Sequence, residues 1–110
     1  MNELRGQLEA GLKSALRARD GVAAGALRST LGAIDNASAV EGPDRYRPRL
    51  GVGAGEAARR ELSIEEMRGI VRAEVADRAS AAAEYELLGR PAEADRLRAE
   101  AAVLEPFTRL

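Results

Sequence analysis

Residues 63–89 read SIEEMRGIVRAEVADRASAAAEYELLG and contain the clearest helix signal in the chain. Ser63 and Glu66 form the pattern of a capping box, in which each side chain accepts a hydrogen bond from the backbone of the other residue. Gly89 is a typical C-terminal stop, because glycine adopts the left-handed conformation that ends many helices. The signals predict a helix to about Leu88 that is roughly 39 Å long. This length exceeds the width of a small bundle, so one end is expected to project or to carry a partner surface.

One face of this predicted helix is an apolar seam with helical spacing. Leu62 and Met67 stand at the two positions of a hydrophobic staple, which fixes how the chain enters the helix. The members of the seam are Ile64, Met67, Val71, Val75, Ala82 and Tyr85.

Arg78 falls on this seam, where a guanidinium without a partner is costly. We therefore expect a carboxylate beside it. Glu74 lies one turn earlier, and Asp35, Glu100 and Glu105 are candidates from other helices. The favoured interpretation is a partly buried ion pair that fixes the helix register. The alternative is an anchor for a phosphate or for a carboxylate of a partner.

Two helices are predicted before this one. The first spans residues 2–18, and the second spans residues 21–39 behind the plausible cap Asp20. The first carries an apolar stripe whose members recur every four residues, while Gly6 and Gly11 weaken it by about 1 kcal/mol each relative to alanine. The members of that stripe are Leu4, Leu8, Leu12 and Leu16.

A fourth helix is predicted to begin at Pro91, because proline is favoured in the first turn of a helix. Leu97 and Leu104 lie on its apolar stripe, and Pro106 is expected to end it. The remaining residues, 107–110, are expected to form a loose tail.

Residues 40–61 differ in composition from the helices on either side, because they are rich in glycine and proline. They predict a long flexible loop, which is either disordered or functional. The glycine run at 51–55 lacks the Gly-Lys-Ser/Thr of a phosphate-binding loop, so we interpret it as a linker. Arg59 and Arg60 are among the arginines around this run, and Tyr46 is suitable for stacking on a base. A solvated loop is the favoured interpretation, and an RNA-contacting loop is the alternative.

The residue types that are missing limit the chemistry. The 110 residues include no cysteine and no histidine, which removes disulfides, thiol nucleophiles, the commonest general base and the commonest metal ligand. The net charge of -1 argues against strong nonspecific binding to nucleic acid. No apolar run approaches the roughly 18 residues that a membrane span needs, and the N-terminus does not resemble a signal peptide. We therefore expect a cytoplasmic protein that needs no metal or cofactor.

The second half of the chain is acidic. Residues 63–110 carry ten acidic residues and seven arginines, a net charge of -3, which disfavours RNA binding along that face. The acids stand at solvent-facing helix positions, and Arg96 and Glu100 have the i,i+4 spacing of an ordinary ion pair.

A series of residues spread over nearly the whole chain matches one family pattern. The matching residues are Leu27-Arg28 with Leu31, Ile34 and Asn36, then Arg60-Glu61-Leu62-Ser63 with Glu65-Glu66, then Arg78, Tyr85, Gly89-Arg90, Glu100 and Leu104-Glu105. In their order and spacing they resemble the YqeY-like family, which shares a domain with the tail of the B subunit of the tRNA-dependent amidotransferase (GatB).

The resemblance implies an N-terminal helical domain followed by a small three-helix domain. This sequence continues only with Pro106–Leu110, so the second domain is expected to be absent and residues 1–110 to be a single domain. The resemblance also implies an accessory role alongside a carbon–nitrogen ligase that uses glutamine as amido-N-donor, rather than catalysis. The partner would be tRNA or amidotransferase subunits. The candidate contact residues are Arg28, Arg59, Arg60, Arg78 and Arg90.

The sequence thus predicts an all-α bundle of four main helices that binds tRNA or a tRNA-processing partner and is not catalytic by itself. The alternative is a protein–protein interaction or homodimerisation module without RNA binding, which the long third helix and the tail at 107–110 favour. A free-standing enzyme is the least favoured hypothesis, because the usual catalytic side chains are missing.

Overall fold

The computed structural model describes residues 3–39 and 61–110, and these ranges are helical apart from short connections. The elements are α1 (Glu3–Arg17), α2 (Gly21–Ser38), α4 (Ile64–Leu87), α5 (Pro91–Leu104) and the short 3-10 helix η2 (Glu105–Arg109). The predicted all-α bundle is confirmed, and its long helix α4 has 24 residues. The predicted loop over 40–61 lies, except for Glu61, outside the described residues.

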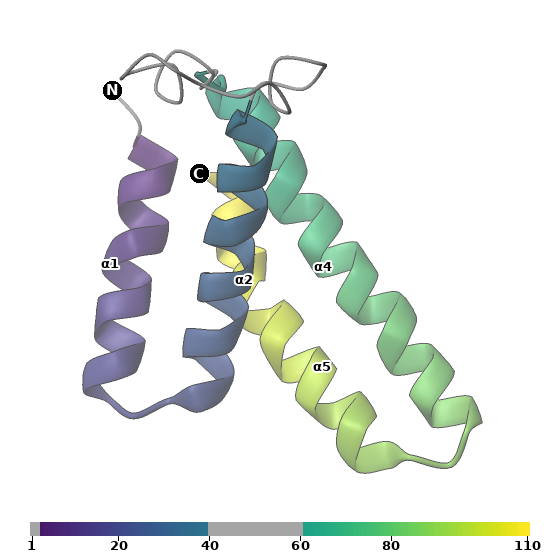
Figure 1. The fold of residues 1–110 in the computed structure, drawn as a ribbon. Coiled ribbons are helices and arrows are strands. Elements are labelled where there is room, and N and C mark those ends of the chain that lie inside the picture. The colour runs from purple at the N-terminus through teal and green to yellow at the C-terminus, as the bar shows by residue number, and fades with distance from the viewer. Residues whose placement is uncertain (1–2, 40–60) are drawn as a thin grey trace, which may run out of the picture.

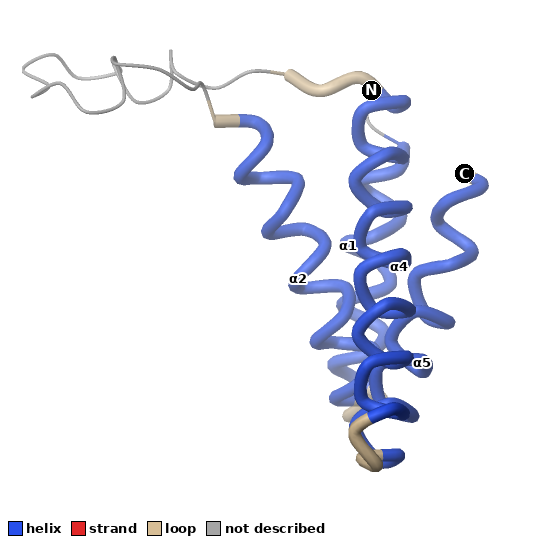
Figure 2. Tube along the Cα trace, turned by 90° about the vertical axis from the view of Figure 1, so that its right-hand side faces the viewer, coloured by secondary structure: helices blue, strands red, loops and turns tan. Residues whose placement is uncertain are grey.

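The helices form two hairpins that diverge toward their turns (Figure 1). α1 pairs with α2 and α4 pairs with α5, while α2 also packs on α5 and so joins the hairpins. The view from the side places α2 on one flank of the molecule and η2 on the other (Figure 2). Both turns lie at the same end of the molecule in the two views.

The core lies where the two hairpins meet. Leu62 and Met67, the predicted staple, are both buried in it. Thr30 is fully buried, and its hydroxyl donates to the Ala26 carbonyl at 2.9 Å, so no polar group is left unpaired there. The largest fully buried apolar side chains are Leu4, Leu8, Ile34, Met67, Val71 and Leu104.

The predicted capping box at the start of α4 is confirmed. The Glu66 backbone N–H donates to Ser63 Oγ at 3.0 Å, and the Ser63 backbone N–H donates to Glu66 Oε1 at 2.9 Å. Asp20 caps α2 in the predicted way, since its carboxylate accepts from the Ala23 N–H at 3.0 Å. These caps satisfy N–H groups that have no partner within the helix.

The predicted apolar stripe of α1 is wrong at its last member. Leu4 and Leu8 are buried, but Leu16 is 50% exposed and Ala15 is buried in its place. The reason is geometric: a four-residue step turns about 40° beyond one full turn of an α-helix. Three such steps rotate Leu16 by about 120° from Leu4, which takes it off the core face.

The last residues do not form the loose tail that the sequence predicted. Glu105–Arg109 form η2, and Phe107 packs partly buried against the core. Arg68 Nε donates to the Leu110 carbonyl at 2.7 Å, which ties the end of the chain to α4. Pro106 stands in the first turn of η2, where its missing N–H costs nothing, so it begins a new helical turn rather than ending the ordered chain.

The turn after α1 is a Schellman motif. The Asp20 N–H donates to the Ala15 carbonyl at 2.9 Å, and the Arg19 N–H donates to the Leu16 carbonyl at 3.1 Å. Arg19 accordingly has a φ of 58°, a left-handed conformation that L-residues adopt at a cost.

The turn after α4 has the same design. The Arg90 N–H donates to the Tyr85 carbonyl at 2.9 Å, and the Gly89 N–H donates to the Glu86 carbonyl at 3.1 Å. Gly89 has a φ of 72°, as expected of the predicted stop. The two turns therefore differ mainly in whether glycine occupies the left-handed position.

This difference predicts opposite effects of two substitutions. Arg19→Gly should raise the free energy of unfolding by about 1 kcal/mol, because it relieves left-handed strain, and Gly89→Ala should lower it by about 1 kcal/mol. Urea unfolding followed by circular dichroism measures both changes. The prediction fails if Arg19→Gly destabilises the protein, because the arginine side chain would then contribute more than its backbone costs.

Within ranges 3–39 and 61–110, none of the helices has the length and apolar character required to cross a membrane.

Candidate functional site

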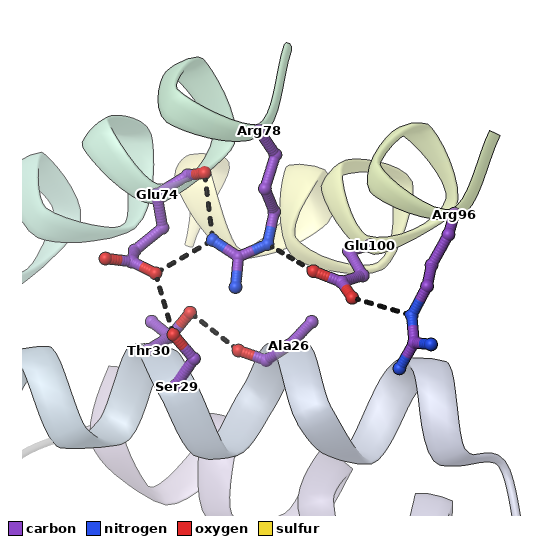
Figure 3. A network of polar contacts seen from close by, with 7 residues as sticks. All are labelled: Ala26, Ser29, Thr30, Glu74, Arg78, Arg96 and Glu100. Atoms are coloured by element: carbon purple, nitrogen blue, oxygen red, sulfur yellow. Dashed lines mark hydrogen bonds and ion pairs between the residues drawn. The ribbon is translucent and has the colours of Figure 1, made fainter. Parts of the chain in front are cut away.

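Arg78 is at the centre of a polar network between α4 and α5 (Figure 3). Its Nη1 donates to Glu74 Oε1 at 2.8 Å and to the Glu74 carbonyl oxygen at 3.1 Å. Its Nε donates to Glu100 Oε1 on α5 at 2.9 Å. The sequence predicted a carboxylate beside Arg78, and the structure places two there, those of Glu74 and Glu100.

The network continues to a third helix. Ser29 Oγ on α2 donates to Glu74 Oε1 at 3.2 Å, and Arg96 Nε lies 3.5 Å from Glu100 Oε2 (Figure 3). The predicted i,i+4 pair between Arg96 and Glu100 is thus confirmed. One continuous set of contacts links α2, α4 and α5, and it fixes how these helices are aligned.

The central groups are largely removed from solvent. The side chains of Arg78, Glu74 and Glu100 are 12%, 19% and 15% exposed. Burial alone would lower the pKa of Arg78, but its hydrogen bonds to Glu74 and Glu100 and the attraction of both carboxylates outweigh burial and raise the pKa. Arg78 therefore stays charged and holds both carboxylates.

The other two predicted partners of Arg78 are engaged elsewhere. Asp35 accepts a hydrogen bond from Arg5 at 2.9 Å, and Glu105 accepts one from Arg109 at 2.9 Å. Glu100 pairs with Arg78 because it faces Arg78 across the contact between α4 and α5 (Figure 3).

Two further candidate contact residues are exposed arginines. Arg28 lies on α2, and we find no ion pair or hydrogen bond of its side chain with any other residue of ranges 3–39 and 61–110. Arg90 precedes α5; its Nη2 donates to Glu93 Oε2 at 2.8 Å and its guanidinium carbon lies 5.8 Å from the centroid of the Tyr85 ring. The hydrogen bond from Arg90 lowers the pKa of Glu93.

In the described part of the chain, no hydrogen bond or ion pair joins the candidate contact residues to one another. Arg28, Arg78 and Arg90 come from α2, α4 and the start of α5, and the contacts of Arg78 and Arg90 are to carboxylates and a ring rather than to one another. Arg59 and Arg60 lie outside the described residues. Most N–H groups of the Arg78 guanidinium donate hydrogen bonds to Glu74 and Glu100, so Arg78 serves to align the helices. Of the three described candidates, Arg28 is the one whose guanidinium has no hydrogen bond or ion pair in ranges 3–39 and 61–110 and can therefore bind a ligand most readily.

The sequence interpretation missed an exposed apolar pair at the turn between α4 and α5. Leu87 is 88% exposed and Leu88 is 69% exposed. A signal was present for Leu87, which does not have the spacing of the seam through Ala82 and Tyr85, but not for Leu88, which follows Tyr85 by three residues.

The interpretation also missed an open groove of about 330 Å³ beside the turn between α1 and α2. Residues from both helices line it, together with Val103 on α5 and Phe107 in η2. In the described ranges, no group of three or more potential ligands is arranged to hold a metal ion.

Comparison of the chain with models of known protein families, with curated proteins and with solved structures found no match. The resemblance to the YqeY-like family therefore rests on the residues quoted above and stays a prediction.

Proposed function

We propose that the chain is a non-catalytic helical module of the YqeY type, which binds tRNA or a protein of the tRNA-processing machinery. The observation that carries the proposal is the link between Arg78 and Glu100. These two residues belong to the family pattern, and in the fold they are direct partners at 2.9 Å. Ser63 and Gly89 also belong to the family pattern, and each has a defined part in the fold: Ser63 caps α4, and Gly89 provides the left-handed turn after it.

The side chains favour binding over catalysis. Without histidine or cysteine, the chain has neither the usual proton carrier at neutral pH nor a thiol nucleophile. Arg28 and Arg90 are exposed and can contact phosphate oxygens, which position a protein on nucleic acid. Arg78 has the supporting task of aligning the helices that carry them.

The test is a titration of labelled tRNA at low and at higher salt. The wild-type chain should bind saturably at low salt, and salt should weaken the binding because counterions are released from the phosphates. Combining Arg28→Glu with Arg90→Glu should weaken binding by about tenfold or more and should reduce the salt dependence by about one unit of slope for each lost phosphate contact.

Arg109→Glu is the matched control, because Arg109 is also exposed but lies in η2 at the other end of α5. It should leave tRNA binding nearly unchanged. Two results would count against tRNA as the ligand: no saturable binding by the wild-type chain, or the same loss in the control as in the double variant.

One observation favours a second candidate function, a protein–protein interaction module. Leu87 and Leu88 are adjacent, exposed and outside the core. Single exposed leucines are ordinary, but a contiguous apolar surface often marks a contact site.

A further inference from the structure

Positive charge is concentrated in the first hairpin, around the turn between α1 and α2. Segment 10–32 contains four cations and one acid, a net charge of +3. The acid is Asp20, whose carboxylate already accepts the Ala23 N–H at the start of α2. Residues 63–110 have a net charge of -3, so this segment and the second hairpin are opposite in charge. The four cations are Lys13, Arg17, Arg19 and Arg28.

These four side chains are exposed, and their charges are not offset by a neighbour in the described structure. None of them forms a hydrogen bond or an ion pair with a residue of ranges 3–39 and 61–110. The second hairpin differs, because six of its seven arginines are paired with a carboxylate and only Arg72 has no such contact in the same ranges. The uncompensated positive charge of the described chain therefore lies mainly on the first hairpin.

The cations border one hollow between the two helices. The hollow has a volume of about 170 Å³, and its lining includes Leu16 and Arg19 from the end of α1 and Ala24 from α2. Lys13 lies one turn before Leu16, and Arg28 lies one turn after Ala24. Because the two helices are antiparallel (Figure 1), both steps lead away from the turn. Lys13 and Arg28 thus border the side of the hollow opposite to Arg19.

The backbone of Arg19 is a separate sign that an arginine is needed here. Its φ of 58° is left-handed, and the equivalent position in the other turn is occupied by Gly89. A side chain in this conformation costs stability, and such strain is often kept at functional sites. Within the described ranges, no hydrogen bond or ion pair of the Arg19 side chain offsets the cost.

We propose that Lys13, Arg17, Arg19 and Arg28 form a basic surface that binds the phosphate backbone of RNA. The inference rests on the tRNA-binding form of the proposed function and places its main phosphate contacts on the first hairpin. α1 lies at one edge of the molecule (Figure 1), so RNA can reach this surface without crossing the acidic second hairpin. Arg90 lies apart from the basic surface, at the turn of the second hairpin.

The side chains favour RNA over a lipid surface or an acidic protein. A helix that lies in a lipid surface needs a broad apolar face, but Leu4 and Leu8 of α1 are buried in the core and only Leu16 is an exposed large apolar residue there. Protein interfaces commonly have aromatic anchors, and segment 10–32 contains no aromatic residue. Arginine, by contrast, suits bidentate contact with phosphate oxygens.

The first experiment is a titration of labelled tRNA at several salt concentrations. Four phosphate contacts predict that the logarithm of the affinity falls with the logarithm of salt with a slope of about -3. Combining Lys13→Gln with Arg17→Gln should weaken binding about tenfold at low salt and should reduce the size of the slope by about 1.5. Both side chains are exposed and have no partner in the described ranges, so circular dichroism should not change.

The matched control combines Arg72→Gln with Arg109→Gln. It removes the same charge from two exposed positions of the second hairpin and η2, and it should leave the affinity and the slope nearly unchanged. An RNA hairpin of unrelated sequence should bind the wild-type chain within a few-fold of tRNA and should lose the same factor in the Lys13 and Arg17 variant. The reason is that phosphate contacts carry no direct sequence information.

The second experiment uses Arg19→Gly, which should change stability and binding in opposite directions. The substitution relieves the left-handed backbone and should raise the urea midpoint of unfolding, while the loss of one phosphate contact should weaken tRNA binding by several-fold. A merely structural role for Arg19 would not produce the loss of binding. Tighter or unchanged binding by this variant would remove Arg19 from the basic surface.

The outcomes separate this surface from the function on which it rests. If the wild-type chain shows no saturable binding of tRNA at low salt, both the inference and the RNA-binding function are overturned. If tRNA binds saturably but the Lys13 and Arg17 variant and Arg19→Gly bind it as the wild type does, the basic surface is overturned and the function stands. Vesicles of phosphatidylcholine with phosphatidylserine test the lipid alternative: binding to them in place of tRNA, weakened by the same variants, would also overturn the inference.

Discussion

Replacing Arg78 with methionine should lower the free energy of unfolding by about 3 kcal/mol. Glu74 and Glu100 are both largely buried, and without the guanidinium Glu74 would have no cationic partner while Glu100 would keep only the more distant Arg96. The loss is expected to come mainly from these poorly compensated carboxylates and less from the attraction itself, because two charges removed from water regain little net energy by pairing. Urea unfolding followed by circular dichroism measures the change.

Two further variants separate these explanations. Arg98→Met removes an arginine whose pair with Glu86 is exposed on both sides, and it should cost less than about 1 kcal/mol. Replacing Arg78, Glu74 and Glu100 together by methionine should recover most of the loss, since no buried charge of the network is then left; Arg96 loses Glu100 but is 67% exposed and stays hydrated. If the triple variant is as unstable as Arg78→Met, the specific hydrogen bonds matter more than the uncompensated charges.

The dependence on pH has a defined sign. The pKa of Arg78 is raised in the folded state, so its contribution is fully present below the unfolded pKa and is lost only as pH rises through the higher folded pKa. That loss lies far above neutral pH. The difference in stability between the wild-type chain and Arg78→Met should therefore stay constant from neutral to mildly alkaline pH.

Local sequence signals were sufficient for the helices. The capping box at Ser63 and the stop at Gly89 are properties of a few neighbouring residues, so they could be identified without knowledge of the fold. The need for a carboxylate beside Arg78 also follows from its place on an apolar seam. The choice of Glu100 over Asp35 depends on how α5 is placed against α4, and no local pattern contains that information.

The failures have two physical causes. Leu16 was assigned to the core by its four-residue spacing alone, although the geometry of the helix itself rotates it off the core face. Phe107 follows a proline that normally stops a helix, and its contact with the core depends on the tertiary arrangement. The exposure of Leu87 and Leu88 also depends on the tertiary arrangement, because it follows from the divergence of the hairpins (Figure 1).

Leu104→Ala should lower the free energy of unfolding by about 3 kcal/mol, because Leu104 is fully buried at the point where α5 passes into η2. The same substitution at exposed Leu87 should change the stability of the monomer by less than about 0.5 kcal/mol. The comparison holds the chemistry constant and varies only burial, and urea unfolding at low protein concentration measures both.

The same pair of variants tests the divergence of the two hairpins. Leu87 lies at the turn between α4 and α5, away from the core, and Leu104 lies where the two hairpins meet (Figure 1). If Leu87→Ala costs as much as Leu104→Ala, Leu87 packs into the core, and the two hairpins do not diverge in solution as they do in Figure 1.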